Sequence, residues 1–178
     1  MAWMNPGFDS PWVHENIEIY RRIENLLIWV DFLFWYTQTM KTKFILHGGM
    51  TSQDNPNNDS FFAEFSKDLK NGDTVLYVPF ARSGPNEQQE VFGRDKKSIL
   101  KHTDKQLYIE KAELNTFIAQ LENADAVFVT GGTTKILKER LLTCPEFAEL
   151  IKGKFYAGSS AGANVISQFH TSGFAEGI

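Results

Sequence analysis

The sequence is poor in cysteine: Cys144 is the only one among 178 residues. A single cysteine cannot form an internal disulfide bond, and no pair of cysteine or histidine residues stands at the spacing of zinc ligands. The composition therefore predicts a cytoplasmic protein that holds no metal and needs no cofactor. We expect Cys144, which precedes Pro145 in the sequence, to be a small apolar filler in a turn.

Positive charge is also scarce. The chain has 18 lysine and arginine residues against 22 aspartate and glutamate residues, which gives a formal net charge of −4. The two signs are interspersed, so no basic face forms that would attract a polyanion. This pattern excludes nucleic acid as an expected partner.

Long hydrophobic runs are absent as well. The most apolar window, residues 26–36, has only eleven residues and is interrupted by Asp31, whereas a membrane-spanning helix needs about 20. No small-residue cleavage site follows it, which argues against a secretory signal. We expect an amphipathic or partly buried helix over about 11–39 and no membrane partner.

Met40 opens the sequence "MKTKFILHGG", which looks like a natural start: a short basic lead followed by a buried strand. We therefore interpret residues 1–39 as an appendage, or as an over-extended reading frame. Residues 40–178 are then expected to form one α/β domain.

From Met40 onward, short apolar runs rich in β-branched and aromatic residues alternate with helical patterns. This alternation is typical of βαβ units and predicts a three-layer, doubly wound, mostly parallel sheet. Helices are expected between the strands, the first capped by Asp59 or Ser60 and a later one over 111–121. The expected strands cover residues 43–47, 74–81, 106–110, 125–130 and 154–158.

The end of the last expected strand contains the pattern G-x-S-x-G, formed by Gly158, Ser160 and Gly162. Between a strand and a helix, this pattern predicts a nucleophile elbow, in which small neighbours keep the serine hydroxyl exposed. The start of the helix also places backbone N–H groups beside the reacting carbonyl, and Ala161 N–H is one natural oxyanion donor. The alternatives are tight strand-to-helix packing or a phosphate-binding turn.

The stretches "YAGSSAGANVIS", "DAVFVTGGTTKILKERL" and "LYVPFARS" together resemble the peptidase E and cyanophycinase family of serine peptidases, over most of residues 41–178. The resemblance implies a class I glutamine amidotransferase-like (flavodoxin-like) fold. It also implies a peptidase that cleaves short peptides or isopeptide links at aspartyl residues through an acyl-enzyme. By the same resemblance Ser160 is the nucleophile, and the glycine pair at 131–132 supplies the second oxyanion N–H through Gly132, the alternative being a plain tight turn.

The resemblance also implies a catalytic histidine some tens of residues beyond the serine, where this sequence has already ended at Ile178. We therefore expect a C-terminally truncated chain with little activity, because a serine without its base is a weak nucleophile. His47 is the one histidine expected at the catalytic edge of the sheet, either as a substitute base or as a residue that orders the following glycine turn. Three others are expected away from the serine: His14, His102 and His170.

Two further candidates belong to the same site. By the resemblance, Glu176 falls where the family places an acidic residue after the nucleophile, and we take it as the candidate acid. Arg82, at the end of an expected strand, is suited to hold a substrate carboxylate in a bidentate pair, the alternative being an exposed loop arginine.

Two functions therefore stand as hypotheses. The first is a serine peptidase acting on small peptides, and the second is a non-catalytic amidotransferase-like module that binds a small carboxylate or phosphate. A glutamine amidotransferase proper is set aside, because those enzymes have a cysteine where this chain has Ser160. Strands missing after Ile178 would leave an open sheet edge, which predicts self-association into a homo-oligomer.

Overall fold

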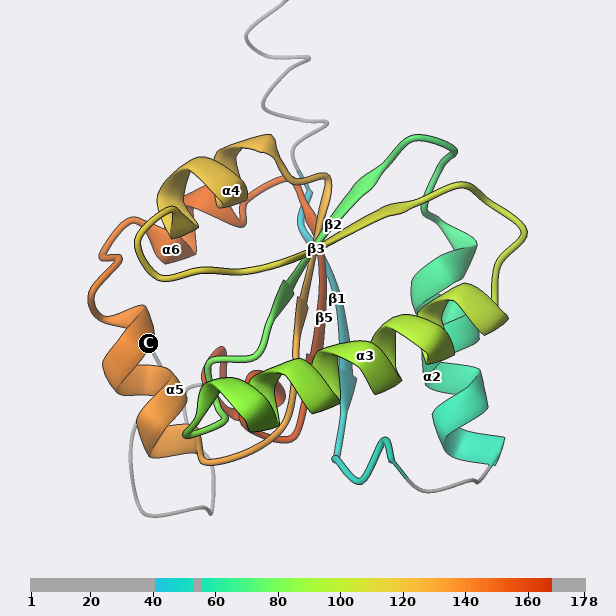
Figure 1. The fold of residues 1–178 in the computed structure, drawn as a ribbon. Helices are drawn as coiled ribbons and strands as arrows, with labels where there is room; N and C mark the ends of the chain where they lie inside the picture. Colours follow the sequence, from blue (N-terminus) through green and yellow to red (C-terminus); the bar gives the residue numbers. More distant parts are fainter. Residues whose placement is uncertain (1–40, 53–55, 168–178) are drawn as a thin grey trace, which may run out of the picture. The chain divides into compact units, whose positions relative to one another are not determined.

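The computed structural model describes residues 41–52 and 56–167 (Figure 1). The predictions for the segment 1–39, for His170 and for Glu176 lie outside these residues. The described chain forms one five-stranded parallel sheet with the strand order β1-β5-β4-β2-β3. Its strands are β1 (Lys43–His47), β2 (Thr74–Val78), β3 (Tyr108–Lys111), β4 (Ala126–Val129) and β5 (Phe155–Ser159).

Helices cover both faces of this sheet, as Figure 1 shows: α2 and α3 lie on one face, and α4, α5 and α6 on the other. The predicted three-layer α/β architecture is thereby confirmed. No helix in residues 41–52 and 56–167 is long and apolar enough to cross a membrane. The helices are α2 (Pro56–Lys67), α3 (Pro85–Lys101), α4 (Phe117–Asn123), α5 (Thr134–Leu141), α6 (Phe147–Leu150) and α7 (Ala161–Asn164).

Two of the three interior strands of the sheet, β5 and β4, are completely buried. All four residues of β4 and all five of β5 are buried, as expected for parallel strands covered on both faces. On the α2 face, the rings of Phe61, Phe62 and Phe65 surround Phe128 of β4, with centroids 5.5 to 6.0 Å apart. Each buried aromatic ring removes a large apolar area from water, so this cluster fixes α2 on the sheet.

The order of the strands positions the site. In the pairing of β4 with β5, Val129 is opposite Gly158, and in the pairing of β1 with β5, His47 is opposite Ser159. The carboxyl ends of β1, β5 and β4 therefore meet at one edge of the sheet. The loops that follow these strands are neighbours in space although they are far apart in the sequence.

Several sequence predictions of element boundaries were wrong. The strand expected over 74–81 ends at Val78, and the strand expected over 106–110 begins at Tyr108. The helix expected over 111–121 begins only at Phe117, because Lys111 still pairs with Tyr77 in the sheet and Ala112 N–H donates to Tyr77 O. Asp59 and Ser60 do not cap α2, since the helix already begins at Pro56; a proline fits the first turn of a helix, where its missing N–H costs nothing.

At the outer edge of the sheet, β1 exposes apolar side chains. Phe44 is 47% exposed and Leu46 is 51% exposed. Self-association through such an edge stays a prediction.

Candidate active site

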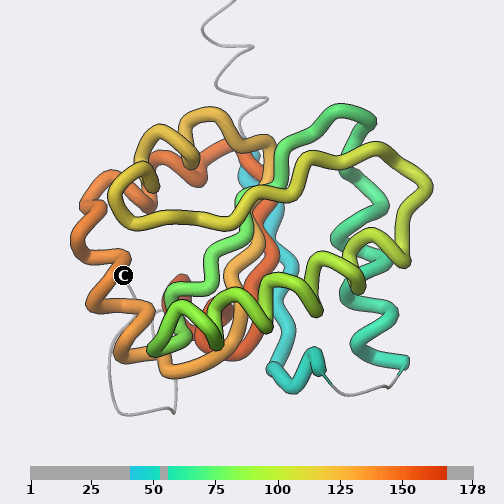
Figure 2. The backbone as a smooth tube through the Cα atoms, in the orientation of Figure 1, coloured from blue at the N-terminus to red at the C-terminus, as the bar shows by residue number. Residues whose placement is uncertain are grey.

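Four loops that follow strands gather at one edge of the sheet. In Figure 2 the segments after β1, β2, β4 and β5 come together at the lower edge of the tube. This edge is where a doubly wound sheet binds its ligands, because each loop can present backbone groups and side chains toward a shared centre.

Ser160 has an unusual backbone conformation at this edge, with φ 49° and ψ −107°. A non-glycine residue rarely adopts a positive φ, and such a conformation persists only where its surroundings hold it. Here Ser160 N–H donates to His47 O at 2.8 Å, while Ser160 O accepts from the N–H groups of Ala163 and Asn164, both at 2.9 Å. The chain thus turns sharply from β5 into α7 with the serine at the apex.

The two glycines of the G-x-S-x-G pattern have a packing role. A Cβ atom on Gly162 would lie 2.2 Å from Val129 O, and one on Gly158 would lie 2.6 Å from Gly162 O. Helix α7 therefore crosses β4 and β5 at a distance that only glycine allows. Tight packing explains the glycines, but it does not explain why a serine occupies the strained position between them.

Two other glycines border the Ser160 side chain. A Cβ on Gly49 would lie 2.9 Å from Ser160 Cβ and 3.3 Å from its Oγ, and a Cβ on Gly131 would lie 3.1 Å and 3.7 Å from the same two atoms. The serine is thus held between the loop after β1 and the turn after β4. The contact of Gly49 with Ser160 was not predicted from the sequence, although a glycine pair at a strand end is a signal for close approach.

Gly132 and Ala161 were the predicted oxyanion donors. Gly132 has φ +151°, and a Cβ there would lie 2.5 Å from Ala81 O, so no other residue fits. Within the glycine pair, Gly131 is packed against Ser160 and Gly132 against the loop after β2. Ala161 is buried and is the first residue of α7, where N–H groups have no acceptor within the helix.

His47 is at the predicted edge, but its ring is engaged. Gly49 N–H donates to His47 Nδ1 at 3.1 Å, and the ring packs on Phe61 with centroids 4.9 Å apart. The lone pair of Nδ1 accepts this hydrogen bond, so it is not free to take a proton from Ser160. The structure therefore supports the second predicted role of His47, which is to order the glycine turn.

His102 is also accounted for. It follows the last residue of α3, where Nδ1 lies 2.7 Å from Ser98 O and Nε2 lies 2.9 Å from a carboxylate oxygen of Asp59. Both ring nitrogens thus have partners away from the serine. Neither of the histidines in the described residues is available as a base for Ser160.

Arg82 lies in the loop after β2 and already has a carboxylate partner. Its Nη1 is 3.0 Å from Glu87 Oε1, and Glu87 Oε2 accepts from Ser83 N–H at 3.1 Å. The side chain is 27% exposed, and its Nε is buried without a hydrogen-bond partner among the described residues. Arg82 is thus a partly buried, paired arginine with unused donor capacity.

Sequence reasoning missed a buried carboxylate beneath this edge. Asp95 of α3 is fully buried, and its Oδ2 accepts from Tyr77 Oη at 2.7 Å and from Thr130 Oγ1 at 3.1 Å. Its Oδ1 accepts from Arg94 Nε at 2.9 Å. Burial raises the pKa of Tyr77, and the charge of Asp95 raises it further.

This carboxylate is connected to the turn beside Ser160, because Thr130 directly precedes the glycine pair. A signal for Asp95 did exist in the sequence: it stands four residues from both Val91 and Ile99, on the buried face of the helix.

The chain resembles known proteins in sequence and in fold. The sequence model of peptidase family S51 matches residues 44–175. A solved structure named "Putative Peptidase E Protein from Listeria monocytogenes EGD-e" is 24% identical, with a TM-score of 0.54 over 71% of this chain and 62% of that chain. A peptidase from an acI-B1 Actinobacterium is 21% identical, with a TM-score of 0.49 over 73% of this chain and 58% of that chain.

The chain thus spans about three fifths of the length of the two solved structures, from the 62% and 58% given above. At this level of identity the first of them supports the fold. No curated protein matches the sequence significantly.

Proposed function

Because the chain belongs to peptidase family S51, we propose that it contains the nucleophile of a serine peptidase, and that this nucleophile is Ser160. The observation that carries the proposal is the positive φ of Ser160 at the turn from β5 into α7. A strained backbone is costly, about 1–3 kcal/mol, and such residues cluster at active sites. In a nucleophile elbow the strain presents the hydroxyl above the sheet.

The proposed reaction has two stages. Ser160 Oγ attacks the carbonyl carbon of the scissile peptide bond, and its proton passes through a base to the leaving amine as the C–N bond breaks. Water then hydrolyses the acyl-serine ester and returns the proton to Oγ. We propose that the base comes from outside residues 41–52 and 56–167, since His47 and His102 are engaged elsewhere. Glu176 stays the proposed acid.

The oxyanion of the tetrahedral intermediate is proposed to accept from Gly132 N–H and Ala161 N–H. Support comes from the packing of this glycine turn against Ser160 and from the position of Ala161 at the start of α7. One such donor typically contributes about 10²- to 10³-fold to kcat.

The proposed substrate is a short peptide with an aspartyl residue at the cleaved bond. Arg82 supports this specificity, because its guanidinium lies in a loop at the catalytic edge and already binds a carboxylate, that of Glu87. A partly exposed ion pair of this kind is worth only about 0.2–1 kcal/mol. The aspartyl side chain of a substrate can therefore share or displace Glu87.

The second candidate is a binding module that holds a small carboxylate at the same edge without cleaving it. The observation that favours it is the engagement of both described histidines, which leaves Ser160 without a base in that part of the chain.

The test is hydrolysis of short peptides that differ only in aspartate or asparagine at the cleaved bond. Ser160→Ala is expected to abolish cleavage, while Ser159→Ala, which removes a neighbouring buried hydroxyl, is the matched control and retains it. Arg82→Ala is expected to raise KM for the aspartyl peptide and to leave the asparaginyl peptide unchanged. Cleavage by Ser160→Ala at the wild-type rate would refute the proposal, and binding of the aspartyl peptide without turnover would establish the module instead.

A further inference from the structure

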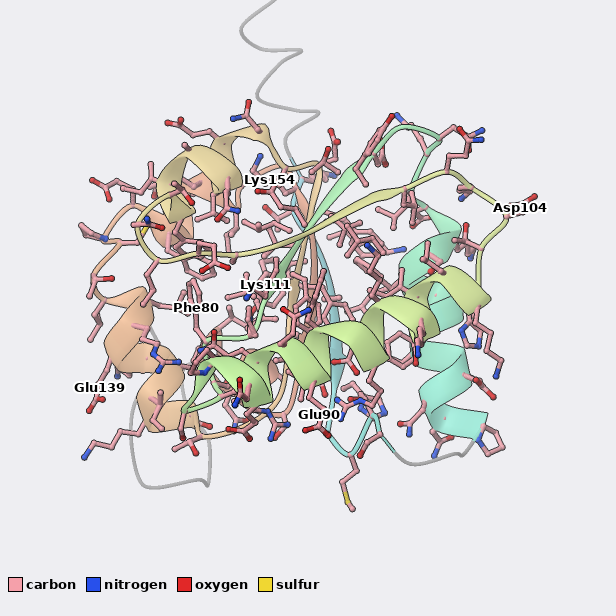
Figure 3. The ribbon with its side chains drawn as sticks, viewed as in Figure 1. Phe80, Glu90, Asp104, Lys111, Glu139 and Lys154 are labelled. Carbon is pink, nitrogen blue, oxygen red and sulfur yellow. The ribbon has the colours of Figure 1, made fainter. Side chains whose placement is uncertain are left out.

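Arg140, near the end of α5, is bonded to the loop that follows β2. Its Nη1 donates to Phe80 O at 2.8 Å and to Arg82 O at 2.6 Å, and its Nη2 donates to Ser83 O at 3.1 Å. In Figure 3 Phe80 lies between α5 and the sheet, whereas Glu139, the neighbour of Arg140 in the sequence, points away from the sheet. One side chain thus satisfies three backbone carbonyl groups of a single loop.

These bonds determine the direction of the carbonyl group between them. Because Phe80 O and Arg82 O both point to Arg140, Ala81 O is left to point elsewhere, and it accepts from Thr133 N–H at 2.9 Å. Ala81 O is also the atom that Gly132 approaches so closely that a Cβ would lie 2.5 Å away. The loop held by Arg140 is therefore the surface on which the glycine turn rests.

The contacts form a closed ring. The loop after β2 contacts Thr133, α5 begins at the next residue, and Arg140 at the other end of α5 returns to the same loop. Leu137, between these two ends, is fully buried and fixes the helix on the sheet. The loop and the glycine turn consequently cannot shift independently of each other.

We propose that Arg140 is a positioning residue: it holds the glycine turn at 131–132 against Ser160 and holds Arg82 at the catalytic edge. This inference rests on the proposed function of Ser160 as a nucleophile. The guanidinium of Arg140 donates its hydrogen bonds to backbone carbonyl groups, so Arg140 acts through the loop. An arginine is required because its planar fork reaches three carbonyl groups, which the single nitrogen of a lysine does not.

The experiment compares Arg140→Ala and Arg140→Lys in the full chain with a control on the same helix, Lys135→Ala, which removes an exposed positive charge. The first readout is the rate at which a fluorophosphonate labels Ser160. The second is hydrogen exchange of the Thr133 amide, measured by NMR, which reports the bond to Ala81 O without any catalysis.

For Arg140→Ala we expect labelling to slow about 10- to 100-fold, as for displacement of an oxyanion donor by a fraction of an ångström. We expect exchange of the Thr133 amide to accelerate at least about tenfold, because its acceptor is no longer fixed. Added guanidinium ion should partly restore the wild-type labelling rate and the wild-type exchange rate. In both rates Arg140→Lys should lie between Arg140→Ala and the wild type. Lys135→Ala should match the wild type in both readouts.

Wild-type labelling and wild-type Thr133 exchange in Arg140→Ala would overturn the inference. So would equally faster exchange at amides throughout the chain without rescue by guanidinium, because that result indicates only a general loss of stability. If Arg140→Ala does not fold, Arg140→Lys provides the test. Exchange of the Thr133 amide at the wild-type rate in Arg140→Lys would then overturn the inference. If the wild type itself does not label at Ser160, the proposed function fails, and the Thr133 amide alone decides whether Arg140 holds the turn.

Discussion

Gly162→Ala tests the packing of the serine turn directly. A Cβ at this position would lie 2.2 Å from Val129 O and 2.9 Å from Val129 Cβ. The shortest ordinary carbon-to-oxygen contacts in proteins are about 3.3 Å, so α7 must move by about 1 Å from β4. Val129 is fully buried in the centre of the sheet and cannot yield instead.

The magnitude follows from two opposing terms. Replacing glycine by alanine in a helix is favourable by at most about 1 kcal/mol, whereas overpacking a tight interior costs about 1–3 kcal/mol or more. We therefore expect Gly162→Ala to lower the free energy of unfolding by about 1–2 kcal/mol. The displacement of about 1 Å should also slow fluorophosphonate labelling of Ser160 about 100-fold.

Gly93→Ala is the matched control, because Gly93 is inside α3 and nothing lies within 4 Å of its added Cβ. It receives the same propensity gain without a clash, so it should stabilise the protein by about 0.5–1 kcal/mol. Urea denaturation of both variants checks that Gly162→Ala lowers the free energy of unfolding and that Gly93→Ala raises it. If Gly162→Ala is as stable as Gly93→Ala and labels at the wild-type rate, the reasoning about the elbow is refuted.

Two further predictions concern buried polar groups. Asp95→Ala should lower the free energy of unfolding by about 3 kcal/mol, because the hydroxyls of Tyr77 and Thr130 lose a charged acceptor. Asp95→Asn retains an acceptor, so it should lower the free energy of unfolding by less, as measured by urea denaturation. Equal stability of the two variants would contradict this account. Burial raises the pKa of Tyr156 and, together with the charge of Asp95, that of Tyr77. Above about pH 10 the unfolded chain therefore binds fewer protons than the folded one, and the free energy of unfolding should fall with rising pH, by about 1 kcal/mol per unit for each tyrosine. Tyr156→Phe should reduce this slope in denaturation curves between pH 9 and 11, and an unchanged slope would exclude Tyr156 as its source.

The sheet could be predicted from the sequence because its buried strands are runs of apolar residues. The apolar run over 125–130 predicted a strand covered on both faces, and the structure buries every residue of β4. The boundaries were less predictable where pairing partners decide them: Lys111 remains in the sheet only because Tyr77 lies opposite.

The site was predictable only in part. The pattern G-x-S-x-G identifies the serine turn, because any side chain at its two glycines would clash with nearby backbone atoms. The contact of Gly49 with Ser160 depends on β1 and β5 being neighbours, and hydrophobic periodicity does not encode strand order. The bonds of Arg140 depend on the directions of three carbonyl groups in a loop, which no residue pattern specifies.

The most direct measurement of the central claim is mass-spectrometric mapping of a fluorophosphonate adduct on the full chain. The account predicts one adduct, on Ser160, present in Ser159→Ala and absent in Ser160→Ala. An adduct on Ser159, or no adduct on a chain that still cleaves aspartyl peptides, would contradict the assignment of Ser160 as the nucleophile.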